Sequence, residues 1–358
     1  MFAELSLDLL LAAARLSGVS DIHLSSRSPM YARKYGVLQA VDSRVLTEKQ
    51  MKDMLQSGLP GIAWDTLRAC GDLEMVLEIP GKGRYRLTVV RHRGGWSLTG
   101  RVIDQYVRSM EDAGLPSVCH KMTQWAQGLV LIVGPAGSGK TSTLATMVEM
   151  INQERAEHII TIENPIEFVF TPKKSQISQR QVGVHSISQE TALRAAMRED
   201  PDVIVVGEMR DLTTCHLAVS AAETGHLVFA TMNTNDASQT LNALINSFPP
   251  EEQSAIRNMV AESLRGVVCQ QLIPRKDGAG VVGAFEILMN NAAVASMIKS
   301  GRSKQLNNVI ATGKGEGMLL LDDSLKALVD RQVISVQEAY ARAINPASFI
   351  YQTGTPHG

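Results

Sequence analysis

Hydrophobic residues in the second half of the chain form short, nearly unbroken runs. These runs are "LVLIVG" (129–134), "HIITIE" (158–163), "VIVVGE" (203–208) and "HLVFATM" (226–232). Runs of this length and composition are typical of parallel strands that are buried on both faces. Helices are expected between them, over 141–153, over 189–199 with Ser188 as N-cap, and over 212–224 between Asp211 and Gly225. The alternation predicts a doubly wound α/β domain.

The first hundred residues have a different pattern, in which strand-like runs alternate with amphipathic helices. "DIHLSS" (21–26) and "GRYRLTVVRHRGGWSLTGRVI" (83–103) predict strands, the second of them a hairpin that turns near Gly94 and Gly95. "LTEKQMKDML" (46–55) has helical spacing, with Thr47 as the N-cap. This part of the chain is therefore expected to be a small α+β domain.

These changes of pattern predict a four-part organisation. Residues 104–118 are charged and contain Gly-Leu-Pro, which favours an interdomain linker, and after a strand at "VVGAFEILM" (281–289) the remainder has mainly helical patterns. The predicted parts are an N-terminal α+β domain (1–103), the linker (104–118), the α/β domain (119–290) and a C-terminal helical region (291–358). A length of 358 residues suits two or three domains.

Composition narrows the functional classes. Hydrophobic residues make up 44% and charged residues 20% of the chain, and the net charge is −1, which is an ordinary globular balance. No block of Lys or Arg is present, so nucleic-acid binding is not expected. The four cysteines form no CxxC pair, which disfavours a zinc module and a disulfide framework and favours the cytoplasm. The first 18 residues carry Glu4 and Asp8, and predict an amphipathic helix rather than a signal peptide.

The strongest chemical motif is "GPAGSGKT" (134–141), which fits the phosphate-binding pattern G-x-x-x-x-G-K-[ST] between a predicted strand and a predicted helix. Glycines let backbone N–H groups converge on phosphate oxygens at a helix N-terminus. Lys140 is expected to reach the β- and γ-phosphates of ATP, and the Thr141 hydroxyl to hold Mg²⁺. The predicted nucleotide-binding residues are Gly134, Pro135, Ala136, Gly137, Ser138, Gly139, Lys140, Thr141 and Ser142.

Acidic residues end two of the predicted strands. Glu208 follows "VIVV" in the manner of a Walker B acid, which binds Mg²⁺ directly or through water, and Glu163 ends "HIITI" before an Asn-Pro corner. The carboxyl ends of parallel strands lie along the edge where ligands bind, so both acids are expected beside the phosphates. Glu163 is the candidate for activating water, and Glu167 is a weaker one. The alternative is that each is a solvated strand end.

Four segments together resemble a known family. These segments are "GLVLIVGPAGSGKTSTLATM", "HIITIENPIEF", "LRAAMREDPDVIVVGEMRD" and "AAETGHLVFATMNT". They are similar to the secretion ATPases of type IV pilus and type II secretion systems, and above all to the PilT-type retraction ATPases with their paralogue PilU. The resemblance implies a homohexamer of PAS-like and RecA-like domains with ATP bound between them. It also implies work on a platform protein at the inner membrane, where the ring would sit on the cytoplasmic side.

The resemblance assigns roles by position. It makes Glu163 the catalytic base of the family's Asp box, and His226 a member of the His box over 226–233. It also brings N-domain arginines to ATP. Arg84 and Arg86 are two apart on one strand and so share a face, and Arg101 comes from the next strand. The alternatives are a basic strand face with ion pairs for the arginines, and an ordinary hydrogen-bonded histidine at a strand start for His226.

Two residues and one segment depart from the family pattern. Asn164 replaces the aspartate of Glu-Asp-Pro, Asn233 replaces the second His-box histidine, and "AVASMIKSGRSKQL" (293–306) stands where the family has a sequence like AIRNLIRE. Asn cannot take up a proton. Two functions therefore stay open: an ATPase motor for pilus retraction, or a weakly hydrolysing ring subunit that partners a paralogous retraction ATPase. The missing cysteine motif disfavours the assembly branch of the family, and the charge balance disfavours a DNA translocase.

Overall fold

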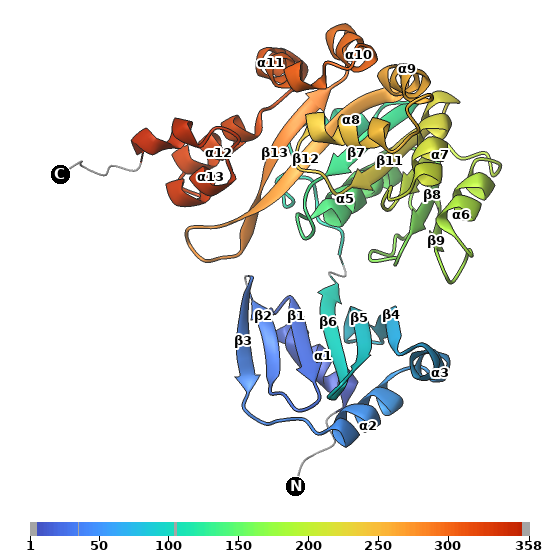
Figure 1. Ribbon diagram of the computed structural model, residues 1–358, viewed down its shortest axis with the longest axis vertical. Coiled ribbons are helices and arrows are strands. Elements are labelled where there is room, and N and C mark those ends of the chain that lie inside the picture. The colour runs from blue at the N-terminus through green and yellow to red at the C-terminus, as the bar shows by residue number, and fades with distance from the viewer. Residues whose placement is uncertain (1–5, 35, 104–105, 353–358) are drawn as a thin grey trace. The chain divides into compact units, whose positions relative to one another are not determined.

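The computed structural model describes residues 6–34, 36–103 and 106–352 (Figure 1). The chain divides into two compact units. The first comprises Met1–Tyr106 together with Pro165–Val169, and the second comprises Val107–Asn164 and Phe170–Gly358. The four-part organisation stays a prediction, and its residues 1–5, 35, 104–105 and 353–358 lie outside the described part of the chain.

The first unit is built on a six-stranded sheet in the order β3-β2-β1-β6-β5-β4, in which every neighbouring pair is antiparallel. Its strands are β1 (Asp21–Ser25), β2 (Met30–Lys34), β3 (Val37–Asp42), β4 (Asp72–Ile79), β5 (Gly83–His92) and β6 (Gly95–Ile103). Its helices are α1 (Leu7–Leu16), α2 (Glu48–Gly58) and α3 (Gly61–Cys70). Apolar side chains of all three helices share one core with β5, because alternate residues of that strand are buried.

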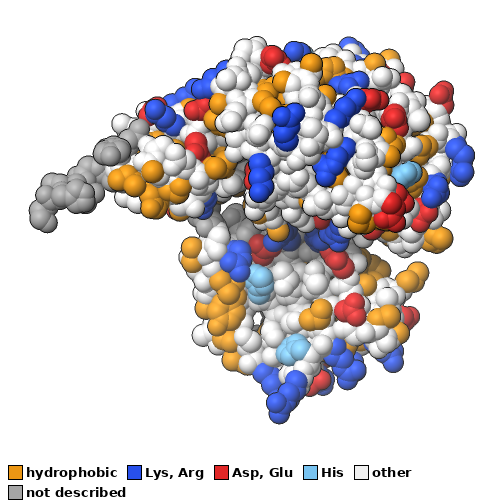
Figure 2. Space-filling model, turned by 45° about the horizontal axis from the view of Figure 1, so that its top comes forward, with side chains coloured by type: hydrophobic (Ala, Val, Ile, Leu, Met, Phe, Trp, Pro, Cys, Tyr) orange, Lys and Arg blue, Asp and Glu red, His pale blue; other side chains and the backbone are white. Residues whose placement is uncertain are grey.

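The predicted hairpin and helix cap of this unit are confirmed. β5 and β6 pair up to His92 and Gly95, and Thr47 caps α2 by accepting a hydrogen bond from the Gln50 backbone N–H. The sequence did not single out β2, β3 or β4. β3 is an edge strand that is exposed along most of its length, so it lacks the alternation that reveals a half-buried strand. Hydrophobic side chains gather on the left side of this unit in Figure 2.

The second unit contains a seven-stranded sheet in the order β13-β12-β7-β11-β10-β8-β9. Its strands are β7 (Gly128–Val133), β8 (His158–Glu163), β9 (Gln176–Gln181), β10 (Val203–Val206), β11 (Leu227–Met232), β12 (Leu264–Pro274) and β13 (Val281–Met289). All neighbours are parallel except β12 and β13. β7, β10 and β11 are buried along their whole length, which confirms the reading of the unbroken apolar runs.

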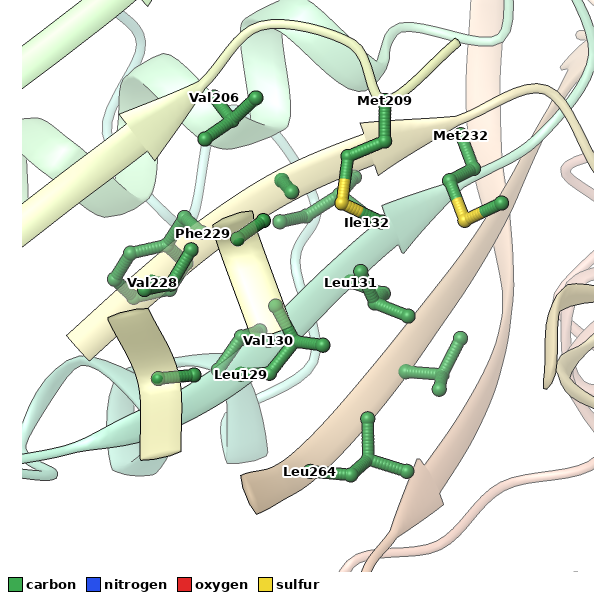
Figure 3. Close-up of a cluster of buried hydrophobic side chains, with 14 of the residues drawn as sticks. Leu129, Val130, Leu131, Ile132, Val206, Met209, Val228, Phe229, Met232 and Leu264 are labelled. Carbon is green, nitrogen blue, oxygen red and sulfur yellow. The ribbon is translucent and has the colours of Figure 1, made fainter. Parts of the chain in front are cut away.

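The three helices predicted between the strands of this unit are present as α5 (Lys140–Glu154), α6 (Gln189–Ala196) and α7 (Leu212–Glu223). The same part of the chain also contains α4 (Val118–Thr123), α8 (Ala237–Asn246) and α9 (Gln253–Ser263). Ser188 and Asp211 cap α6 and α7 through their side chains, as expected. Figure 3 shows apolar side chains of β7, β10, β11 and β12 packed together, including Val130, Phe229 and Leu264.

The C-terminal region is helical, as the sequence predicted. It comprises α10 (Ala292–Lys299), α11 (Leu306–Thr312), α12 (Leu321–Asp330) and α13 (Val336–Arg342), with short 3-10 turns. A small separate hydrophobic core joins α12 and α13 to β12 near Ile273 and to β13 near Ala284. Among the described residues, no helix has the length and apolar character needed to cross a membrane.

Candidate nucleotide-binding site

The phosphate loop joins the carboxyl end of β7 to the N-terminus of α5. Gly134, Gly137 and Gly139 have φ angles of +155°, +78° and +88°, so the loop needs backbone conformations that residues with a β-carbon rarely adopt. α5 begins at Lys140, directly after Gly139. The first N–H groups of a helix have no intrahelical partner and carry partial positive charge, which makes this end suited to an anion.

The loop is pressed against β12. A β-carbon on Gly134 would lie 2.3 Å from the Gln270 backbone oxygen, and one on Gly139 would lie 2.9 Å from Gln270 Nε2. A β-carbon on Gly137 would meet nothing within 4 Å. Close packing against the backbone therefore requires glycine at Gly134, whereas at Gly137 and Gly139 the positive φ angle is the stronger requirement, because the neighbour of Gly139 is the end of a side chain that can move.

Lys140 lies over the loop. Its Nζ donates hydrogen bonds to the backbone oxygens of Gly134 at 2.8 Å and Pro135 at 3.0 Å. Burial lowers the pKa of Lys140, while the negative charge of Glu208 acts in the opposite direction. The Ser138 hydroxyl is buried and has no hydrogen-bond partner among the described residues. A half-buried cation, a buried unpaired hydroxyl and a helix N-terminus together suit a phosphate group.

Glu208 lies two residues beyond β10 and is held from several sides. The Asn233 Nδ2, just beyond the end of β11, donates a hydrogen bond to Glu208 Oε1, and Arg210 pairs with Glu208 Oε2 at 2.6 Å. Gln189 Nε2 donates to the Glu208 backbone oxygen at 2.8 Å. The carboxylate of Glu208 is thus fixed on the side of the sheet where β7 ends.

Glu163 ends β8, as predicted, on the same edge of the sheet. Its Oε1 accepts hydrogen bonds from Thr161 Oγ1 at 2.6 Å and from Gln179 Nε2 at 3.1 Å. Gly207, the residue before Glu208, packs against this corner: a β-carbon there would lie 3.4 Å from the Glu163 Cα. The phosphate loop, Asn233, Glu208 and Glu163 therefore follow four adjacent strands, β7, β11, β10 and β8, at their carboxyl ends.

His226 lies at the opposite edge of the sheet. It precedes β11, whose first residue Leu227 pairs with Gly128 at the start of β7, whereas the phosphate loop follows the end of β7. Six strand residues separate the two edges, which is about 20 Å at 3.3 Å per residue. His226 Nδ1 lies 2.9 Å from the Ala221 carbonyl oxygen. His226 therefore does not reach the phosphate loop of the same sheet, and its predicted catalytic role in the His box stays a prediction.

The predicted arginines lie on one face of the sheet in the first unit. Arg86 pairs directly with Arg101 across β5 and β6, and Arg84 lies two residues away, so the shared face is confirmed. Arg101 Nε donates to Asp21 Oδ1 at 2.7 Å, and Arg86 Nε donates to Glu74 Oε1 at 2.7 Å. Each cation thus has a carboxylate partner within its own unit.

The first unit also includes residues that follow Glu163 in the chain. Arg84 donates to the backbone oxygens of Ile166, at 2.8 Å, and Glu167, and Arg86 pairs with Glu167 Oε1 at 3.3 Å. Glu167 is therefore held by arginines of its own unit, whereas Glu163 is held by Thr161 and Gln179.

Sequence reasoning missed Gln179 and Gln189, which position the two acids. Gln179 lies on β9, a strand that the sequence did not single out, because its mostly half-buried polar residues carry no apolar run. For the metal, Thr141 in the first turn of α5 and Glu208 supply oxygen ligands of the type that Mg²⁺ prefers. The described residues contain no cluster of three or more His, Cys, Asp or Glu that could hold a metal without help.

Comparisons with known proteins agree with this arrangement. The family model described as Type II/IV secretion system protein matches residues 4–314. The type IV pilus retraction ATPase PilT of Pseudomonas aeruginosa is 38% identical over 340 residues, covering 95% of this chain and 98% of that protein. The type IV pilus ATPase PilU of the same species is 30% identical, covering 91% and 85%. A crystal structure of the pilus retraction motor PilT with bound ADP superposes with a TM-score of 0.86 at 35% identity, covering 96% and 99%.

Proposed function

The chain belongs to the Type II/IV secretion system protein family, and on that premise we propose that it hydrolyses ATP to retract a type IV pilus. The observation that carries the proposal is the row of groups at the carboxyl edge of the second sheet: phosphate loop, Asn233, Glu208 and Glu163. We assign the second unit to the RecA-like ATPase core, followed by the C-terminal helices, and the first unit to the PAS-like domain of this family.

The residues divide the chemistry among them. Backbone N–H groups of the loop and Lys140 bind the phosphates and hold the terminal one at the sheet edge. Thr141 and Glu208 would hold Mg²⁺, directly or through water, and a bound ion would supply positive charge to neutralise the phosphate oxygens. Glu163 orients the attacking water and accepts its proton, because Thr161 and Gln179 keep its carboxylate fixed.

Arg84, Arg86 and Arg101 supply positive charge from the first unit. Phosphoryl transfer spreads negative charge over the equatorial oxygens, and a well-placed arginine raises the rate by about 10³–10⁵-fold. In this proposal the arginines exchange their present carboxylate partners for phosphate during turnover. The assembly is a homohexamer on the cytoplasmic side of the inner membrane, where it acts on the pilus platform protein.

A second function is favoured by two positions. Asn164 and Asn233 lack the charge or the proton-accepting nitrogen of the residues they replace in the family pattern, while Lys140, Thr141, Glu163 and Glu208 are all present. The chain would then be a nucleotide-binding ring subunit with weak hydrolysis that assists a paralogous retraction ATPase. PilU-like proteins are the matching branch.

Steady-state ATPase assays of the purified protein separate these functions. Wild-type turnover that falls to background in Glu163→Gln and Lys140→Ala supports the motor. Glu251→Gln, the same kind of change at an exposed residue just before α9, is the matched control and retains full activity. Nucleotide binding with background turnover in the wild type supports the accessory role, and absence of nucleotide binding refutes both.

A cellular assay tests the biological part. The wild-type gene is placed in a piliated bacterium that lacks its own retraction ATPases, and twitching zones are measured. A motor restores twitching when it is expressed alone. An accessory subunit restores it only together with a paralogue.

A further inference from the structure

One buried polar residue of the second unit belongs to none of the recognised motifs. Gln270 lies on β12, and only 4% of its surface is exposed. β12 pairs in parallel with β7, and the register joins Cys269 to Val133, so Gln270 lies beside Gly134 at the start of the phosphate loop. A polar side chain in this position must be hydrogen-bonded or must face a polar group.

The oxygen of the Gln270 side chain holds α5. Thr143 Oγ1 donates to Gln270 Oε1 at 2.5 Å, and Thr143 is itself buried. The Thr143 backbone N–H also donates to the Gly139 carbonyl oxygen at 3.0 Å, so Thr143 belongs to the first turn after the loop. This turn carries Lys140 and Thr141. The contact therefore fixes the helix end that presents both residues.

The nitrogen of the same side chain faces the loop. Gln270 Nε2 is 2.9 Å from the position that a β-carbon on Gly139 would take, and the Gln270 backbone oxygen is 2.3 Å from the equivalent position on Gly134. Among the described residues, Gln270 Nε2 has no hydrogen-bond acceptor, and it is not one of the completely buried polar atoms that lack a partner. Its N–H groups are thus available on the side that faces the phosphate loop.

From these contacts we infer that Gln270 is a positioning residue of the phosphate site. Its Oε1 anchors the first turn of α5 through Thr143, and its Nε2 supports the base of the loop and adds a donor for an anionic oxygen. The inference rests on the proposed nucleotide binding, but it does not require hydrolysis. A carbonyl–amide pair performs both tasks only when the side chain is Gln, because Glu lacks the donor and Met lacks both groups.

The test compares three variants by the affinity for ADP, measured calorimetrically with the full-length protein. Gln270→Met removes both groups at similar volume, and we expect about tenfold weaker ADP binding. Gln270→Glu keeps the acceptor for Thr143 but places negative charge beside the phosphates, so the loss is expected to exceed that of Met. Thr143→Val removes only the helix anchor, with an expected loss of about threefold.

Gln271→Glu is the matched control, because it makes the same chemical change one residue along β12, where the side chain points to the other face of the sheet. It is expected to bind ADP like the wild type. In nucleotide-free protein, Gln270→Met and Thr143→Val should increase deuterium uptake over 134–143, whereas Gln271→Glu should not. If Gln270 acted only by holding Thr143, Gln270→Met would weaken ADP binding and Gln270→Glu would not, and this result would overturn the role of Nε2.

The possible outcomes separate this inference from the proposed function. ADP affinity within twofold of wild type in both Gln270→Met and Gln270→Glu, together with loss in Lys140→Ala, overturns the inference alone. Wild-type ADP binding without hydrolysis overturns the motor and leaves the inference standing. If Gln270→Glu does not fold, Gln270→Met and Thr143→Val decide, and unchanged affinity in both overturns the inference.

Discussion

Asn233 donates a hydrogen bond from its side-chain amide to a carboxylate oxygen of Glu208, linking the ends of the adjacent strands β11 and β10. The other carboxylate oxygen of Glu208 pairs with Arg210. Asn233, where the resemblance leads us to expect the second His-box histidine, is thus a neutral donor that orients the proposed metal ligand. This contact connects a departure from the family pattern with a definite geometric task.

Removing that donor should slow turnover. In Asn233→Ala, Glu208 keeps Arg210 but loses its partner across the strands. Hydrogen bonds to charged groups contribute about 1.5–3 kcal/mol, and 1.36 kcal/mol corresponds to a tenfold change in rate, so we expect kcat to fall about tenfold at this exposed position. ADP affinity should change by less than about threefold, because Lys140 and the loop are untouched.

Asn235→Ala is the control for this variant, since Asn235 is an exposed residue of the same loop. The measurement is steady-state ATPase kinetics with purified protein. Equal kcat in Asn233→Ala and wild type would show that the contact with Glu208 has no catalytic consequence.

The burial of Glu286 should make the free energy of unfolding depend on pH in a specific way. This residue of β13 is 1% exposed, its Oε1 accepts a hydrogen bond from the Ala237 backbone N–H at 2.9 Å, and its Oε2 has no partner among the described residues. Burial, with a smaller contribution from the negative charge of Asp236, raises the pKa of Glu286 above its ordinary value of 4.5.

The sign follows from proton linkage. Between pH 4.5 and the raised pKa, the folded protein binds more protons at Glu286 than the unfolded chain, so this group lowers the free energy of unfolding as the pH rises. Glu286→Gln removes this cost, because a glutamine carries no charge that burial would penalise. The variant should therefore gain stability relative to wild type between pH 5 and pH 8, by about 1.4 kcal/mol for each unit of pKa displacement.

Urea unfolding at the two pH values measures this difference, and Glu223→Gln serves as an exposed control. A stability difference between Glu286→Gln and wild type that stays constant from pH 5 to pH 8 would contradict the assignment of a raised pKa.

Arg84 should hold the segment 165–169 in the first unit. Two of its guanidinium nitrogens donate to the backbone oxygens of Ile166 and Glu167, and its side chain is 15% exposed. Lysine has a single ammonium group and does not reproduce this fork, so Arg84→Lys should increase deuterium uptake over 165–169. Arg93→Lys, in the exposed turn of the same hairpin, should leave the uptake unchanged. Identical uptake in Arg84→Lys and wild type would refute the anchoring role.

Gly134 and Gly137 should respond differently to alanine. Both have positive φ, but only at Gly134 would the new β-carbon collide, at 2.3 Å from the Gln270 backbone oxygen and 2.4 Å from Ser138 Oγ. Gly134→Ala should therefore abolish the thermal stabilisation that ADP gives. Gly137→Ala should cost about 1–2 kcal/mol from backbone strain and retain binding. Retained ADP stabilisation in Gly134→Ala would contradict the close packing of the loop on β12.

Much of the second unit could be predicted because its signals are local. An unbroken apolar run such as 129–134 reveals a buried strand, and the glycines with Lys140 reveal the loop that follows it. For His226 the local pattern gives a position at the amino end of the strand over 226–232, away from the phosphate loop, whereas its predicted catalytic role comes from the resemblance of "ETGH" to the His box.

The sequence by itself determined which segments become buried strands, where the phosphate loop lies, and which acids end strands at its edge, because hydrophobic periodicity and glycine conformation act over a few residues. Only the tertiary structure decided that Gln270 lies beneath the loop, that Gln179 holds Glu163, and that Arg84 holds the segment after Glu163. The residues of these pairs are 16 to 136 positions apart in the chain. Their contacts depend on strand order and register, which arise from packing of the whole sheet and leave no mark in the local pattern.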